Sequence, residues 1–203
     1  MQVPIICLVT SGEGRVPGLV REAAAASIDL VQIREPMLQG GALATFVREA
    51  INEAIGTSCS MVVNDRFDVA IAAKAAGVHL RADSVAPARI RNIAPAGFLV
   101  GRSVHDPAEA AAITHAGGCD YLIFGTVFPS RSKPAGHRAA GVQKLQDVCR
   151  ATMLPVIAIG GISLENAAEV IAAGARGIAA IDLFQRGRSI SSTVAILRQQ
   201  FDT

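Results

Sequence analysis

Polar and charged side chains recur along this 203-residue chain, at or near the ends of short apolar runs. They supply carboxylate, amide, hydroxyl, imidazole and cationic groups, which can bind phosphate, coordinate Mg²⁺ and transfer protons. Apolar strands that end in such groups are hard to explain as core alone, so they predict a small-molecule site. The candidates are Gln32, Arg34, Asn64, Asp65, Asp83, Ser103, His105, Ser130, Ser132, Lys133 and Asp182.

The pair Gly160-Gly161 predicts a phosphate site, because glycines let a phosphate approach backbone N–H groups. A short helix or turn after the eighth apolar run would add further donors. A tight turn that needs positive φ is the alternative reading. Asp182 would repel the phosphate unless it points away or pairs with Arg186 or Arg188. A helix cap or a salt bridge is its alternative role.

The segment Ser130-Arg131-Ser132-Lys133 carries two hydroxyls and two cations on one loop, which predicts an anion clamp. An ordinary solvated polar loop is the alternative. The segment belongs to the longest candidate loop, 129–141, whose proline, serine and glycine content is typical of a cover over a site.

Asp65 and His105 each have two readings. Asp65 can ligate Mg²⁺ while the neighbouring Asn64 binds an anion, or it can cap a helix that begins near Arg66. His105 can act as an acid or base, or it can make a loop hydrogen bond. His79 lies inside an apolar run, so we expect it to be packed or hydrogen-bonded rather than to be a ligand.

The elements that position these residues follow a regular pattern, in which a short β-branched run alternates with an Ala-rich stretch eight times. Runs that are apolar on both faces are typical of parallel strands buried inside a ring of helices. The expected strands are Ile5–Val9, Leu30–Ile33, Met61–Val63, Val78–Leu80, Phe98–Gly101, Tyr121–Phe124, Val156–Ile159 and Gly177–Ile181. The expected helices lie near 15–26, 40–56, 66–76, 87–94, 107–116, 142–151, 164–173 and 190–201.

Eight such units in one chain of this length predict a single (β/α)₈ TIM barrel over residues 1–203. An open doubly wound sheet is the lesser alternative, since Thr10-Ser11-Gly12-Glu13-Gly14 lacks the third glycine of the dinucleotide-binding pattern. No shift in composition marks a second domain. The site should therefore lie at the C-terminal ends of the strands.

Composition narrows the class of protein further. Apolar residues make up 51% of the chain and the net charge is only +2, so we expect neither nucleic acid nor a membrane as a partner. The four cysteines form no C-x-x-C pair, which is consistent with reduced thiols. The N-terminus lacks the features of a signal peptide, and a cytoplasmic location is expected. Association into a homo-oligomer stays open.

The motifs along the chain are, in order, Leu8-Val9-Thr10, Val31-Gln32-Ile33-Arg34-Glu35, Asn64-Asp65-Arg66, Gly77-Val78-His79-Leu80, Gly101-Arg102-Ser103-Val104-His105, Asp120-Tyr121, Gly125-x-Val127-Phe128-Pro129-Ser130-x-Ser132-Lys133 and Ala158-Ile159-Gly160-Gly161-Ile162. In this order, the motifs resemble those of the thiamine phosphate synthase and thiazole tautomerase family. The match spans nearly the whole chain with compatible spacing.

The resemblance implies a transferase of thiamine biosynthesis, which joins hydroxymethylpyrimidine pyrophosphate to thiazole phosphate and releases pyrophosphate. Ionisation would give a pyrimidine cation that the thiazole nitrogen captures, so the leaving group needs Mg²⁺ and cations more than a base. We expect Arg34, Ser103, Lys133 and His105 to be catalytic. By motif position, the pyrimidine and pyrophosphate ligands are Gln32, Arg34, Asn64, Ser103 and Lys133, the Mg²⁺ ligand is Asp65, and the thiazole phosphate ligands are Ser130, Ser132, Gly160, Gly161 and the Ile181 backbone.

Four departures from the family pattern stand out. Pro36 stands where the family often has lysine, and Asp182 stands where it usually has serine beside the thiazole phosphate. The second metal carboxylate aligns nearest Ser84, which leaves Asp83, one residue earlier, as the candidate ligand. Serines replace the paired threonines of the phosphate loop.

Two alternatives to a synthase remain at this point. The stretch Gly101–His105 and the missing carboxylate resemble the tautomerase branch, which isomerises a thiazole carboxylate phosphate without a metal. The histidine of that branch is here Thr126, which cannot shuttle protons near neutral pH. A non-catalytic binder of thiamine phosphate that kept the fold is the third reading.

Overall fold

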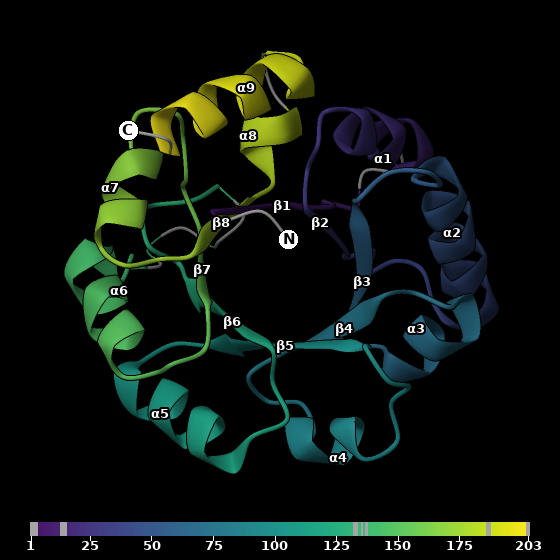
Figure 1. Cartoon of the computed structure of the whole chain (residues 1–203), viewed down its shortest axis with the longest axis horizontal. Coiled ribbons are helices and arrows are strands. Elements are labelled where there is room, and N and C mark those ends of the chain that lie inside the picture. Colours follow the sequence, from purple (N-terminus) through teal and green to yellow (C-terminus); the bar gives the residue numbers. More distant parts are fainter. Residues whose placement is uncertain are drawn as a thin grey trace.

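A computed structural model of the chain describes residues 4–12, 16–131, 134, 136, 138–185 and 188–201. In this part, parallel strands close into a barrel in which each strand pairs with the next and the last pairs with the first. Figure 1 looks down the barrel, with the helices in a ring outside it. The strands are β1 (Ile5–Val9), β2 (Leu30–Ile33), β3 (Ser60–Asn64), β4 (Gly77–Leu80), β5 (Leu99–Val104), β6 (Tyr121–Gly125), β7 (Val156–Ile159) and β8 (Gly177–Ala180).

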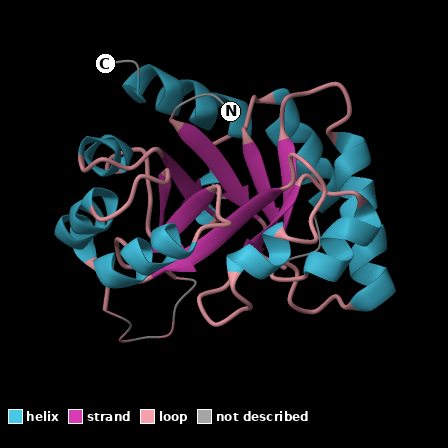
Figure 2. Ribbon diagram, turned by 60° about the horizontal axis from the view of Figure 1, so that its bottom comes forward, coloured by secondary structure: helices cyan, strands magenta, loops and turns pink. Residues whose placement is uncertain are grey.

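A helix follows each strand, and the predicted (β/α)₈ barrel is confirmed. Every expected helix is present, and most are a few residues shorter than predicted. Figure 2 shows them packed around the strands. The helices are α1 (Val16–Ala25), α2 (Gly40–Glu53), α3 (Phe67–Ala73), α4 (Pro87–Arg91), α5 (Pro107–Ala116), α6 (Gly141–Arg150), α7 (Ala167–Ala172), α8 (Asp182–Gln185) and α9 (Ile190–Phe201).

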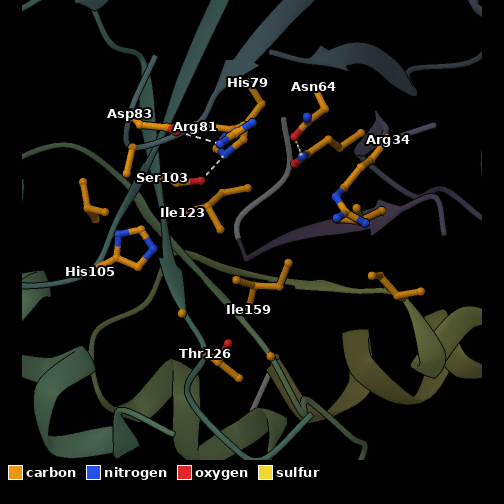
Figure 3. Close-up of a pocket in the computed structure, with 17 residues that line it drawn as sticks. Arg34, Asn64, His79, Arg81, Asp83, Ser103, His105, Ile123, Thr126 and Ile159 are labelled. Carbon is orange, nitrogen blue, oxygen red and sulfur yellow. Dashed lines mark hydrogen bonds and ion pairs between the residues drawn. The ribbon is translucent and has the colours of Figure 1, made fainter. Parts of the chain in front are cut away.

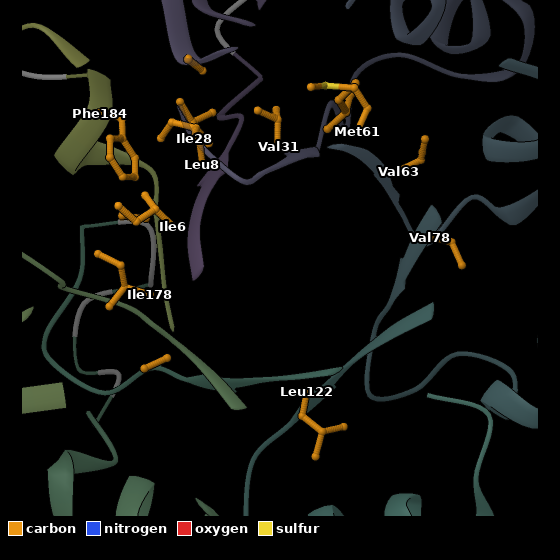
Figure 4. Packing of buried hydrophobic residues seen from close by; sticks show 14 of the residues in the cluster. Ile6, Leu8, Ile28, Val31, Met61, Val63, Val78, Leu122, Ile178 and Phe184 are labelled. Atoms are coloured by element: carbon orange, nitrogen blue, oxygen red, sulfur yellow. The ribbon is translucent and has the colours of Figure 1, made fainter. Parts of the chain in front are cut away.

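Alternation along the strands divides the apolar core into two layers. On β1, Ile6 and Leu8 belong to the layer between barrel and helices, whereas Cys7 and Val9 belong to the layer inside the barrel. Figure 4 shows the outer layer, in which labelled strand residues such as Ile6, Val63 and Leu122 lie on the outer face of the barrel. The inner layer includes Tyr121 and is small. The inward positions nearer the strand ends are therefore left for polar side chains.

The fifth strand is longer than the prediction. It continues to Val104, whereas the sequence indicated an end at Gly101. Arg102 and Ser103 thus lie inside β5 rather than beyond it. Because side chains alternate along a strand, Ser103 shares the barrel side with Gly101, while Arg102 points outward. Because Arg102 and Ser103 are polar, the sequence indicated that the strand ends before them.

Among the described residues, no helix is long and apolar enough to cross a membrane. The cysteines of the described residues are free thiols, of which Cys7 is buried and Cys59, Cys119 and Cys149 are half-buried. Burial raises the pKa of the Cys59 thiol to about 12, so that thiol stays protonated at neutral pH.

Candidate active site

A cavity of about 490 Å³ opens at the C-terminal ends of the strands. Figure 3 shows its labelled side chains around a common space, with Arg34, Asn64, His79 and Ser103 opposite Thr126 and Ile159. The lining residues are Val9, Gln32, Arg34, Asn64, His79, Arg81, Ala82, Asp83, Ser103, Val104, His105, Ile123, Gly125, Thr126, Ile159, Gly160 and Ile181.

A second cavity of about 280 Å³ adjoins the first near β7 and β8. The two cavities share the lining residues Ile159, Gly160 and Ile181, so they meet at the ends of these strands. The second cavity is also lined by Pro129, Ser130, Arg131, Gly161, Ile162, Ala179, Ala180 and Asp182. The site therefore has two compartments with a shared wall.

On the β2 and β3 side, hydrogen bonds fix the polar groups of the first cavity. Gln32 donates its side-chain amide to Asn64 Oδ1 at 3.0 Å, although the two residues are 32 positions apart. The backbone N–H of Arg34 donates to the hydroxyl of the buried Thr10 at 2.8 Å. Thr10 thereby fixes the backbone from which the exposed Arg34 side chain reaches the cavity.

His79 and Ser103 form the polar centre of the cavity floor. His79 Nε2 and Ser103 Oγ share a hydrogen bond of 2.9 Å, and the His79 ring stacks on Tyr121 with centroids 5.6 Å apart. Burial, and secondly the charge of Arg102, lower the pKa of His79 to about 3, so the imidazole is neutral at physiological pH. Gly101 leaves room for the stack, because a Cβ there would clash with Tyr121 and lie 2.6 Å from His79 Nδ1.

The loop after β4 is anchored by Arg102. The buried guanidinium donates to the carbonyl oxygens of Ala82, Ser84 and Val85 at 2.5, 3.1 and 2.8 Å. Charge-assisted hydrogen bonds of this kind are stronger than neutral ones. The outward position of Arg102 on β5 therefore holds a loop that contributes Ala82 and Asp83 to the cavity.

Two carboxylates predicted as metal ligands have different surroundings. Asp65 accepts a short hydrogen bond from the Ser84 hydroxyl, whereas Asp83 is ion-paired with Arg81 at 2.7 Å. Asp65 does not cap α3, because that helix has Arg66 at its N-cap and no side-chain cap bond, so the capping alternative is wrong. Of the two, only Asp83 lines the first cavity.

The glycine pair after β7 allows other groups to approach its backbone closely. Gly160 and Gly161 have φ values of 101° and 63°, so the tight turn that was the alternative reading exists, and it faces both cavities at Gly160. A Cβ on Gly160 would lie 2.8 Å from Thr126 Cα. Asn166 donates its side-chain amide to the Gly161 carbonyl at 3.0 Å, which fixes the turn.

The expected short helix after β8 is also present. It is α8, it begins at Asp182, and Asp182 lines the second cavity. His105 lies at the rim of the first cavity, where its ring nitrogen is 3.5 Å from Glu109.

The structure brings most of the predicted site residues together. The two cavities contain Gln32, Arg34, Asn64, Asp83, Ser103, His105, Ser130, Gly160, Gly161, Ile181 and Asp182. Asp65 lies directly beside Asn64 but lines neither cavity, and Ser132 and Lys133 lie outside the described residues. Sequence reasoning missed Arg81, and its expectation that His79 is packed or hydrogen-bonded is confirmed by the contacts with Tyr121 and Ser103. The signal that could have placed His79 at the cavity was its inward-facing position on β4, two residues after Gly77.

A closed (β/α)₈ barrel with polar cavities at the strand ends defines the class of barrel enzymes that act on small molecules. Comparison with known proteins places the chain within that class. Residues 5–184 match the family model described as thiamine monophosphate synthase. A thiamine-phosphate synthase of Methanoculleus marisnigri is 40% identical over 195 residues, which cover 94% of this chain and 90% of that protein.

Two further relatives agree. A thiamine-phosphate synthase of Methanocella arvoryzae is 39% identical over 81% of this chain and 77% of its own length. The solved structure of a thiamine phosphate pyrophosphorylase from Pyrococcus furiosus superposes with a TM-score of 0.85 and 28% identity, covering 98% of this chain and 95% of that one. The chain therefore belongs to the thiamine monophosphate synthase family, and it is an enzyme of the transferase class.

Proposed function

We propose that the chain joins hydroxymethylpyrimidine pyrophosphate to thiazole phosphate and releases pyrophosphate. The bond between the pyrimidine methylene carbon and the pyrophosphate oxygen breaks, and its electron pair leaves with the pyrophosphate. The thiazole nitrogen then forms the new carbon–nitrogen bond with its lone pair. The products are thiamine phosphate and pyrophosphate.

The observation that carries this proposal is the pair of adjoining cavities. A two-substrate condensation needs two binding compartments whose reacting atoms meet, and here the compartments share Ile159, Gly160 and Ile181. The first would hold the pyrimidine pyrophosphate. The second would hold the thiazole phosphate against Ser130 and the Gly160-Gly161 turn, with backbone N–H donors near the start of α8. Ser132 is expected to add to this anion binding, and Lys133 to the binding of the pyrophosphate in the first cavity.

Polar groups in the first cavity suit a reaction that passes through a cation. Arg34 presents a permanent positive charge at the rim, where the leaving pyrophosphate would gather negative charge. His79 is neutral, because burial keeps its pKa near 3, so it adds no positive charge beside the pyrimidine. It holds the Ser103 hydroxyl in place at 2.9 Å, and the Gln32–Asn64 pair offers further hydrogen bonds.

Mg²⁺ is part of the proposal as the ion that accompanies the pyrophosphate. The described residues contain no group of three His, Cys, Asp or Glu side chains that could form a metal centre. Asp65 and Ser84 nevertheless offer carboxylate and hydroxyl oxygens in contact, and Mg²⁺ is commonly held by one or two carboxylates plus substrate phosphates. These residues fit the ion, with Asp83 as the further candidate ligand. Bound there, it would neutralise charge on the leaving group.

A condensation assay tests the proposal. Purified protein receives both substrates and Mg²⁺, and thiamine phosphate is quantified by chromatography; parallel reactions omit either substrate, or replace Mg²⁺ with EDTA. We expect product only in the complete reaction. Absence of product there, with both substrates shown to bind, would rule the synthase out in favour of a binder. Conversion of a thiazole carboxylate phosphate in EDTA would point to the tautomerase instead.

A further inference from the structure

We propose that Arg81 is a pyrophosphate-binding residue of this chain, with Asp83 as the resting partner that it gives up when the substrate arrives. The proposal rests on the function proposed above and names a residue for the same site. Arg81 follows β4 directly, and its side chain lines the first cavity together with Asp83. Figure 3 shows the two side chains joined at the cavity edge.

Position on the barrel makes Arg81 suitable for this role. Arg34, Asn64 and Arg81 follow or end three neighbouring strands, β2, β3 and β4, and all three line the same cavity. Neighbouring strands lie about 4.8 Å apart, so side chains from β2 and β4 can reach one ligand. The described residues thus place two arginines on either side of an amide. An arginine fork binds phosphate oxygens in a bidentate manner, and two of them suit a ligand with two phosphoryl groups.

The resting contact of Arg81 is weak enough to be exchanged. Its 2.7 Å ion pair with Asp83 joins side chains that are 59% and 70% exposed. Exposed pairs contribute little net stability, because water competes for both partners. A pyrophosphate carries more charge than one carboxylate and would be held partly out of solvent, so it is the better acceptor.

The backbone around the pair does not have to move during the exchange. Arg102 holds the carbonyls of Ala82, Ser84 and Val85, and the Ser84 N–H donates to the Arg81 carbonyl at 3.1 Å. Only the Arg81 side chain needs to rotate. The exchange also leaves the Asp83 carboxylate without its cation, the condition in which it can serve as the metal ligand proposed above.

Calorimetric titration of the full chain with inorganic pyrophosphate in EDTA tests the proposal. We expect Arg81→Ala to weaken binding about tenfold to a hundredfold, the range for losing a charged hydrogen bond, and Arg81→Lys to weaken it less. Asp83→Asn removes the competing partner and should tighten binding a few-fold. Arg66→Ala is the matched control, since Arg66 forms a similar exposed pair with Asp68 at 2.6 Å outside the cavity lining, and it should leave binding unchanged.

Two outcomes would overturn the proposal: Arg81→Ala that binds pyrophosphate within twofold of the wild type, or Arg66→Ala that loses as much affinity. Circular dichroism confirms that each variant is folded. Turnover of the wild type separates this proposal from the function itself. A wild type that makes thiamine phosphate while Arg81→Ala binds normally refutes only the role of Arg81. A wild type that makes no product but binds pyrophosphate through Arg81 refutes only the function.

Discussion

His79 Nε2 lies 2.9 Å from Ser103 Oγ, and this contact joins β4 to β5 at the floor of the first cavity. The imidazole is buried between this hydroxyl and the Tyr121 ring, which explains its neutrality. A neutral histidine can orient Ser103 without adding charge. Its role in the proposed reaction is therefore to position a hydroxyl rather than to transfer a proton.

The lowered pKa of His79 predicts a pH dependence of stability. The folded state binds this proton only near pH 3, while the unfolded chain binds it near pH 6.5. Stability from this group is complete above pH 6.5 and is lost as the pH falls from 6.5 toward 3, by about 1.4 kcal/mol for each pH unit. Urea unfolding between pH 5 and 7.5 should show this slope in the wild type. In His79→Gln the slope should be reduced, and identical slopes would contradict the assignment.

Arg102→Gln should loosen the loop after β4. Three carbonyl oxygens lose a charged donor, and each such bond contributes about 1.5–3 kcal/mol. Hydrogen exchange measured by mass spectrometry should accelerate at least about tenfold over residues 81–86, while α5 keeps its wild-type rate. Unchanged exchange over 81–86 would show that the loop is held by something other than Arg102.

Gly160→Ala should damage both stability and phosphate binding. The positive φ of Gly160 costs about 1–3 kcal/mol for a residue with a Cβ, and that Cβ would collide with Thr126. Thermal unfolding and titration with thiazole phosphate measure the two effects. Gly41→Ala is the matched control, because its Cβ would meet nothing within 4 Å, and it should change neither quantity appreciably. Equal effects of Gly160→Ala and Gly41→Ala on stability and phosphate binding would contradict the close contact between Gly160 and Thr126.

Arg198→Ala should lower the stability of the chain more than the replacement of an exposed arginine does. Arg198 pairs with Asp29 at 2.6 Å, their side chains are 16% and 9% exposed, and Asp29 also accepts the Ile6 N–H at 2.8 Å. Loss of one partner of such a pair costs about 3 kcal/mol, the lower end of the range for buried pairs. Urea unfolding measures it. Arg21→Ala breaks an exposed pair with Glu53, and its midpoint should stay at the wild-type value.

The barrel was predictable from the sequence because each unit repeats the same physical pattern. Short runs that are apolar on both faces, such as Val156–Ile159, must be buried on both faces, and the Ala-rich stretches between them supply the cover. The end of β5 was not predictable. Its last residues include Arg102 and Ser103, and an outward arginine that clamps a loop looks the same in sequence as a loop residue.

The site was predictable at polar positions at or next to the end of a strand, such as Gln32 and Asn64. The sequence carries no such signal for contacts between side chains that come from different loops or strands. The Asp65–Ser84 contact depends on how the loops after β3 and β4 meet in space. His79 is packed and hydrogen-bonded as the sequence predicted, and only the barrel shows that its face of β4 also opens into the cavity.

The central claim is that the two adjoining cavities unite two substrates with release of pyrophosphate. The most direct measurement quantifies thiamine phosphate and pyrophosphate in the same reaction, for the wild type, Arg34→Ala and the control Arg48→Ala on the exposed face of α2. We predict equal amounts of the two products, a fall of about tenfold to a hundredfold in kcat/KM for Arg34→Ala, and no change for Arg48→Ala. Pyrophosphate released without thiamine phosphate, or equal rates in all three proteins, would contradict the account.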